Sequence, residues 1–424
     1  MRLTAVVRMP MLHKRMKDLS WKRWRKPGIM DLGMEKKLRD EGVDVIDANQ
    51  FVREMDRNLY PTDWRTLPDM KPVFPKPPAP NSRDHPDWHD KPVMVFEQES
   101  FPMEGVNQAQ AFTKSVQVKD GLPDSLLESC NFIKLQNPGD AAERIVKQAF
   151  LWDAYTEKLP NLKNFDFPTR VFRRPMGIPA RRSNELLMRN LLRLIEQDNS
   201  SEALSKMISN DEEFRVNVKR HGSDVQMRLS PLMNIMSKRP LCPFLDSSES
   251  ITENHQIPNI YPFLSTANFN NQNVYKEGDF FSVSANSAFP HIHTAVFSHH
   301  IPGSHTHIHP RWNDDRYSGA TIMYAFATAL LGARRKFGDN SSTLPEPVTS
   351  QVVHLTGKEF QFAVFQLNTL DLDNDSSKIK NIVWLTDKIN LFSHIENKLG
   401  TELFDGYNPE PFKILKGLYS SPTI

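Results

Sequence analysis

Histidines provide the most suggestive chemistry in this chain, because seven of its fourteen lie between His291 and His309. If His305-Thr-His307-Ile-His309 were a strand, its period of two would place three imidazoles on one face, where they could bind zinc or iron. Against a metal site, the stretch contains residues typical of loops, namely Pro290, Pro302, Gly303 and Pro310. It also lacks an acid that could act as a base or orient a ligand. The sequence therefore favours an exposed or anion-contacting loop, with a histidine-metal site as the weaker alternative.

Arginines form the strongest basic cluster outside the N-terminus. Five lie within thirteen residues without one acid, at Arg170, Arg173, Arg174, Arg181 and Arg182. The planar guanidinium group matches phosphate, and the intervening prolines keep such a segment extended along a nucleic-acid backbone. We therefore predict contact with RNA phosphates, with pairing to acids elsewhere in the chain as the alternative.

A second basic group comprises Arg334, Arg335 and Lys336, in the last turn of a predicted helix, and it is also a candidate for RNA contact. Four further basic residues are weaker candidates, namely Lys219, Arg220, Lys238 and Arg239. No aromatic signature of an RNA-recognition motif accompanies them, so shape and phosphate contact would be the mode of binding.

Motifs of catalysis are missing from the sequence, which has no Walker loop, Rossmann glycine fingerprint, nucleophile elbow or His-Glu-x-x-His. The run Asp371-Leu-Asp373-Asn-Asp375 begins like a calcium loop but has Ser376 where glycine is required and Ile382 where glutamate is required. This run is predicted to be a polar turn between two strands. We predict no enzyme, no cofactor and no small-molecule substrate.

Composition bounds the architecture. A chain of 424 residues corresponds to roughly two or three domains, and only 17 glycines argue against a glycine-rich nucleotide cradle. The net charge of +2 excludes no class of partner, and two cysteines allow no disulfide framework. The longest apolar stretch, from Ala320 to Ala333, is shorter than the ~18 residues of a membrane-spanning helix, so no span is predicted.

The N-terminal region divides into two parts. Residues 1–26 hold nine basic side chains and one acid, which is typical of a mitochondrial targeting segment, with a retained basic tail as the alternative. Ten prolines between Pro61 and Pro102 then predict an extended arm over residues 27–102. The body would occupy residues 103–424 and could divide into two subdomains that meet near 240–310.

Apolar periodicity predicts mixed helices and strands in the body. Helices are expected over 103–118, 140–157, from Ser183 onward, 317–337, 388–399 and 411–418, and strands over 351–355, 360–367 and 381–385. The helix over 317–337 is apolar nearly all round, so it should be covered on both sides. The fold class is α+β, with a mixed or antiparallel sheet packed against helices and preceded by the extended, basic, proline-rich arm.

Several blocks of this sequence resemble the animal mitochondrial large ribosomal subunit protein thirty-seven family, which is itself similar to the mitoribosomal protein called programmed cell death protein nine. The similar blocks are Glu104-Gly-Val-x-Gln-Ala109, Leu151-Trp152, Ala325-Phe326, and Val364-Phe-Gln-Leu-Asn-Thr369 with Asp371-Leu-Asp373, Lys380-Asn381 and Trp384. The resemblance covers roughly Pro102 to Tyr419 and is thin between Phe165 and Pro310.

The resemblance implies a structural constituent of the mitochondrial large ribosomal subunit in the matrix. It would support mitochondrial translation by packing on the large-subunit rRNA and on neighbouring ribosomal proteins, including the paralogous programmed-cell-death-nine-like protein. The alternative function is a matrix histidine-metal enzyme that uses the 291–309 cluster. The family pattern does not include that cluster, which favours the structural role.

Replacing Arg173, Arg174, Arg181 and Arg182 by alanine should weaken association with the ribosomal particle without unfolding the protein, because each arginine removed is one fewer phosphate-neutralising group. Sedimentation of the variant with the particle, alongside circular dichroism of the purified protein, measures both effects. Unchanged association would remove the case for this loop.

Overall fold

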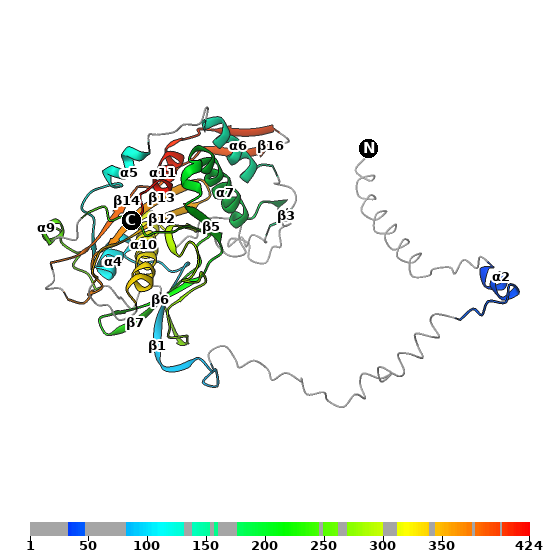
Figure 1. Cartoon of the computed structure of the whole chain (residues 1–424), viewed down its shortest axis with the longest axis horizontal. Coiled ribbons are helices and arrows are strands. Elements are labelled where there is room, and N and C mark those ends of the chain that lie inside the picture. The colour runs from blue at the N-terminus through cyan, green and yellow to red at the C-terminus, as the bar shows by residue number, and fades with distance from the viewer. Residues whose placement is uncertain are drawn as a thin grey trace, which may run out of the picture. The chain divides into compact units, whose positions relative to one another are not determined.

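The computed structural model describes eleven stretches of the chain, which are drawn in colour in Figure 1. They are residues 33–46, 82–130, 138–152, 157–159, 176–245, 249–261, 269–299, 312–338, 344–374, 378–398 and 401–424. The chain forms two units, residues 1–77 and 78–424. In the first unit, helix α2 (Met34–Asp40) has no buried residue and carries an Arg39–Glu35 ion pair of 2.8 Å.

A large mixed sheet is the centre of the second unit. Its strands run in the order β2 (Ser115–Val116), β14 (Asn381–Leu385), β13 (Glu359–Leu367), β12 (Val348–Thr356), β11 (His291–Ser298), β8 (Met233–Ser237) and β5 (Lys206–Asn210). Strand β15 (Ile389–Asn390) also pairs with β13. The β11–β12 and β14–β2 pairs are parallel and the other pairs are antiparallel. The predicted α+β class with a mixed sheet is confirmed.

A smaller sheet has the order β10 (Phe280–Phe281), β6 (Phe214–Arg220), β7 (Ser223–Leu229), β1 (Trp88–Glu97) and β9 (Asn270–Val274). Strand β1 lies within the segment that its prolines assigned to an extended arm. It forms a strand because Val93, Val95 and Phe96 are buried against the sheet. Pro92 falls where the β1–β9 register shifts, and such an irregularity tolerates a residue without a backbone donor.

Helix α10 (Asp314–Phe337) lies between the two sheets, as Figure 1 shows beside β12 and β13 on one side and β6 and β7 on the other. A single apolar cluster contains side chains of α10 and of both sheets, among them Phe326 of α10, Phe365 of β13 and Val216 of β6. The Phe326 and Phe365 rings contact each other edge to face. The prediction of a helix covered on both sides is confirmed. Asn313 caps its N-terminus, because the Asn313 side chain accepts the Arg316 backbone N–H at 2.8 Å.

Helix α4 (Gly105–Thr113) crosses α10 at two glycines. A Cβ atom on Gly319 would lie 2.5 Å from the carbonyl oxygen of Gly105, so only glycine allows this approach. The Val106 backbone N–H also donates to the Asp315 carboxylate at 3.2 Å. The predicted helix over 103–118 ends earlier than expected, because Lys114 takes a left-handed conformation and β2 follows.

The opposite face of the large sheet is covered by four helices. They are α5 (Asp124–Ser129), α6 (Pro138–Phe150), α7 (Ala180–Asp198) and α11 (Glu410–Tyr419). An ion pair between Lys416 of α11 and Asp198 of α7 is almost completely buried and ties two of these helices together. The remaining described elements are α8 (Ser200–Ala203), α9 (Glu249–Thr252), the β3–β4 pair (Glu157–Lys158 and Met176–Gly177) and the β16–β17 hairpin (His394–Lys398 and Thr401–Asp405).

The helix expected over 140–157 ends at Phe150, and Glu157 lies in β3. Two further expectations for local structure are wrong. The helix expected over 388–399 is replaced, in its described part, by β15 and β16, because the apolar spacing there fits both periods and pairing with β13 and β17 decides. The loop expected from Pro290 onward begins instead as strand β11, which is buried on both faces and therefore shows no alternation. No helix in the described ranges is long and apolar enough to span a bilayer.

Replacing Gly319 by alanine should destabilise the protein by about 1–3 kcal/mol, because the added methyl group collides with the backbone of α4. Chemical denaturation of the full chain measures the change in the free energy of unfolding.

Gly332→Ala in the same helix is the matched control. Its methyl group would lie 3.3 Å from Val348 Cγ1, a side-chain atom that can move, and alanine gains about 1 kcal/mol of helix propensity. Equal stabilities of the two variants would contradict the proposed crossing.

Candidate nucleic-acid interface

The predicted arginine cluster is only partly within the described residues. Arg170, Arg173 and Arg174 lie outside them, whereas Arg181 and Arg182 are exposed in the first turn of α7. Arg181 forms an ion pair with Asp211, and both side chains are more than half exposed. A pair of this kind contributes about 1 kcal/mol or less, so Arg181 could exchange Asp211 for a phosphate at little cost.

The basic residues at the end of α10 all have partners inside the protein. Arg334 Nε lies 3.8 Å from the Asp279 carboxylate, and Lys336 pairs with Glu346. Arg335 donates to the Val283 carbonyl oxygen at 3.0 Å and lies over the Phe281 ring. The C-terminal end of a helix favours cations, so these contacts add to a stabilisation that the helix already provides.

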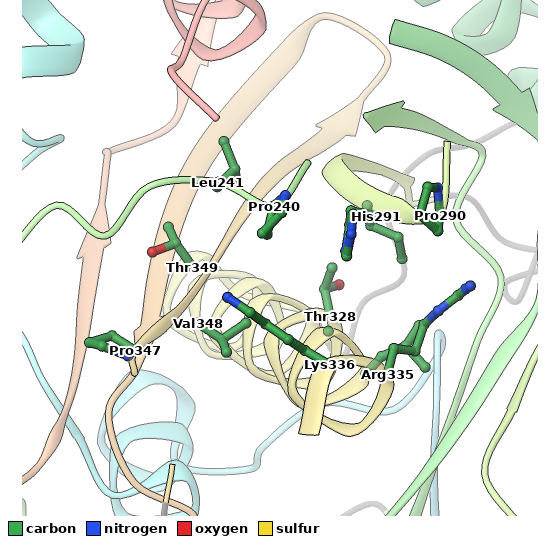
Figure 2. Close-up of a pocket in the computed structure, with 13 residues that line it drawn as sticks. Pro240, Leu241, Pro290, His291, Thr328, Arg335, Lys336, Pro347, Val348 and Thr349 are labelled. Carbon is green, nitrogen blue, oxygen red and sulfur yellow. The ribbon is translucent and has the colours of Figure 1, made fainter. Parts of the chain in front are cut away.

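A small pocket lies at this end of α10, and Figure 2 shows its lining. Pro240 and Leu241 follow β8, Pro290 and His291 lead into β11, and Pro347, Val348 and Thr349 lead into β12. Its volume of about 30 Å³ corresponds to one water molecule. The pocket therefore cannot enclose a nucleotide, and RNA could contact this place only along its surface.

The charge at the pocket comes from arginine and lysine rather than from histidine. Burial, followed by the nearby charges of Arg335 and Lys336, lowers the pKa of His291, so its ring is neutral at physiological pH. Arg335 is half-buried, and its Nη2 atom is itself buried, with no hydrogen-bond partner among the described residues.

Lys238 and Arg239 extend the same basic area. They immediately precede Pro240, which lines the pocket, and both are exposed. Lys238 Nζ lies 5.5 Å from the centre of the Phe289 ring, and no ion pair of either side chain occurs among the described residues. The sequence ranked these two below the arginine cluster, although a Lys-Arg-Pro run directly after a strand was a usable signal. We call Lys238, Arg239, Arg335 and Lys336 the α10 basic surface.

The histidines do not converge in the described part of the chain. His293 is fully buried, contacts Thr294 Oγ1 at 2.9 Å and the Ser421 carbonyl oxygen at 3.3 Å, and burial lowers its pKa to about 3. His299 packs on Trp312 with ring centres 4.0 Å apart. His305, His307 and His309 lie outside the described residues. Within the ranges described, no three His, Cys, Asp or Glu residues form a group that could hold a metal ion.

Comparison with known proteins identifies a ribosomal class of relatives. A family model described as mitochondrial 28S ribosomal protein S30 (PDCD9) matches residues 315–415, from α10 to α11. Over most of its length, the chain is similar to large ribosomal subunit protein mL37 from three animals. Identity is 28% to the Bos taurus protein over 80% of this chain and 78% of that protein, and 28% to the Gallus gallus protein over 82% and 78%. The Mus musculus protein is 27% identical over 78% and 76%. The resemblance expected from the sequence is confirmed.

Replacing Lys238 and Arg239 together by alanine should weaken binding of a short RNA duplex and flatten its salt dependence, because two exposed cations are removed. The slope of log affinity against log salt concentration should fall by roughly one unit for each phosphate that the variant no longer neutralises. Fluorescence anisotropy of a labelled duplex across a potassium chloride series measures both quantities.

Lys358→Ala with Lys413→Ala is the matched control, since both lysines are exposed and lie on other elements, at the β12–β13 turn and on α11. Should the control lose as much affinity as the test variant, binding would depend on overall charge and not on this surface.

Proposed function

We propose that the chain is a structural constituent of the mitochondrial large ribosomal subunit and supports mitochondrial translation there. The similarity to large ribosomal subunit protein mL37, over about four-fifths of both chains, carries this proposal. The match to a family model of mitochondrial ribosomal proteins also supports the proposal. This match covers the central helix, β12 to β17 and most of α11. We assign no reaction to the protein.

The large subunit is favoured over the small one by the extent of the matches. The description of the family model names a 28S ribosomal protein, but the model matches only residues 315–415. The relatives that match most of the chain all carry the large-subunit name. Those matches cover about four-fifths of the chain, whereas the family model covers residues 315–415, so we give the longer matches the greater weight.

In this proposal, the protein acts through surface complementarity. Its body brings a rigid, preformed surface to the particle, and exposed cations such as Arg181, Lys238 and Arg239 neutralise rRNA phosphates and release counterions. Residues 1–26 would direct import into the matrix or remain as a basic tail. The segment over 27–102, of which the last part is β1, would contact neighbouring ribosomal proteins, including the paralogous programmed-cell-death-nine-like protein.

A tagged copy of the full chain should sediment with the large subunit through a sucrose gradient of mitochondrial lysate. Ribonuclease should release it to lighter fractions, and chelation of magnesium should shift it together with the large-subunit rRNA. Immunoblotting of the fractions for the tag, with probes for both ribosomal RNAs, measures this distribution.

A tagged matrix protein without ribosomal similarity is the control for trapping in the gradient. Sedimentation with the small-subunit rRNA after the subunits are separated would reassign the protein to that subunit. Migration as a light species in every condition would overturn the ribosomal proposal.

A further inference from the structure

A cavity of about 720 Å³ lies where four distant segments of the second unit meet. Its walls come from the end of α4, the tip of the β6–β7 hairpin, the segment 253–261 that follows α9, and Lys380 before β14. This volume falls within the range of small-ligand sites. The α10 basic surface shares no residue with this cavity.

The hairpin tip holds Arg220 rigidly at the cavity wall. His221 and Gly222 both have positive φ, which produces the tight two-residue turn between β6 and β7. Asp373 accepts hydrogen bonds from the His221 backbone N–H at 2.8 Å and from Arg220 Nη1 at 2.7 Å. Arg220 Nη2 donates to the Ala111 carbonyl oxygen at 2.8 Å. Arg220 is 4% exposed, and its buried Nε has no acceptor among the described residues.

Two lysines add positive charge to the same wall. Lys114 Nζ donates to the carbonyl oxygens of Asp371 at 3.0 Å and Asn374 at 2.6 Å, and Lys380 Nζ donates to that of Thr252 at 3.0 Å. Carbonyl groups position an ammonium group without cancelling its charge. The one acid in the lining, Glu253, forms an ion pair with Lys378 at 2.6 Å, and Asp373 balances the charge of Arg220. The positive charge that attracts an anion to the lining therefore comes from Lys114 and Lys380.

An aromatic ring stands beside these cations. Tyr261 lines the cavity, is 55% exposed and stacks on the His221 ring with centres 5.5 Å apart and planes 24° apart. The nearby His255 Nδ1 atom is buried and has no hydrogen-bond partner in the part of the chain that the structure describes. An exposed ring next to buried cations matches the two halves of a nucleotide, since bases stack on aromatic side chains and phosphates bind arginine and lysine.

We propose that this cavity binds one unpaired nucleotide of an RNA, with the phosphate attracted by Lys114 and Lys380 and the base stacked on Tyr261. The inference rests on the proposed function, because rRNA would supply the nucleotide. An acidic peptide would satisfy the cations equally well but would make no use of the exposed ring of Tyr261. The aromatic ring is therefore the feature that distinguishes the two ligands.

The test uses the full chain and a fluorescent single-stranded oligoribonucleotide, with affinity measured by anisotropy. Tyr261→Ala should weaken binding about 5- to 100-fold, the effect expected for losing one base stack. Tyr261→Phe should bind like the unchanged chain, because phenylalanine retains the ring. Lys380→Gln should weaken binding and reduce its salt dependence.

Trp152→Ala is the matched control, because Trp152 is also exposed, at 45%, and does not line the cavity. A fully base-paired duplex of the same sequence should show no loss of affinity with Tyr261→Ala, since its bases are not free to stack.

Two results would overturn the inference: no binding of the oligonucleotide by the unchanged chain, or equal affinity of Tyr261→Ala and the unchanged chain. Displacement of the oligonucleotide by polyglutamate in the second case would identify an acidic peptide as the better ligand. If the unchanged chain still sediments with the large subunit, such a result removes only the nucleotide site. Failure to sediment removes the proposed function itself.

Discussion

Burial of α10 from two directions is the constraint on which the rest of this structure depends. A helix that is apolar nearly all round needs two covering layers, and the two sheets provide them. Its 15 buried residues run without a gap longer than one position from Tyr317 to Ala333. Each large apolar side chain buried there contributes about 1.5–3 kcal/mol. The helix is therefore the common core of both sheets. The residues at its two ends are held in place by this packing.

The same packing gives a structural role to short motifs on which the sequence resemblance was based. Gly105, in the block that begins at Glu104, lies where α4 meets Gly319 of α10 with almost no space between the backbones. Asp373, in a run that begins like a calcium loop, instead holds the β6–β7 hairpin through Arg220 and the His221 backbone. Both positions join elements that are far apart in the sequence, so their role is to fix how the layers meet.

Contacts within the protein determine which basic residues could bind RNA. Arg334 and Lys336 pair with acids, and Arg335 is half-buried over an aromatic ring, so a basic run in the sequence is not equivalent to a free basic surface. Arg181, Lys238 and Arg239 remain exposed because they lie at element ends, where no second layer covers them. An interface with RNA would consequently combine contributions from separate loops and would not follow one stretch of sequence.

The sequence by itself determined the α+β class, the central helix, the strands around Gln351, Phe360 and Asn381, and the ribosomal resemblance. These follow from local periodicity and from short motifs, which the sequence contains in full. Only the tertiary structure decided that Trp88–Glu97 is a strand, that 389–398 is not helical and that His291–Ser298 lies inside a sheet. It also brought Arg220, Tyr261 and Lys380 to one cavity. The physical reason is that strand pairing and cavity walls depend on contacts with other segments of the chain, and such contacts leave no periodic signal within the segment itself.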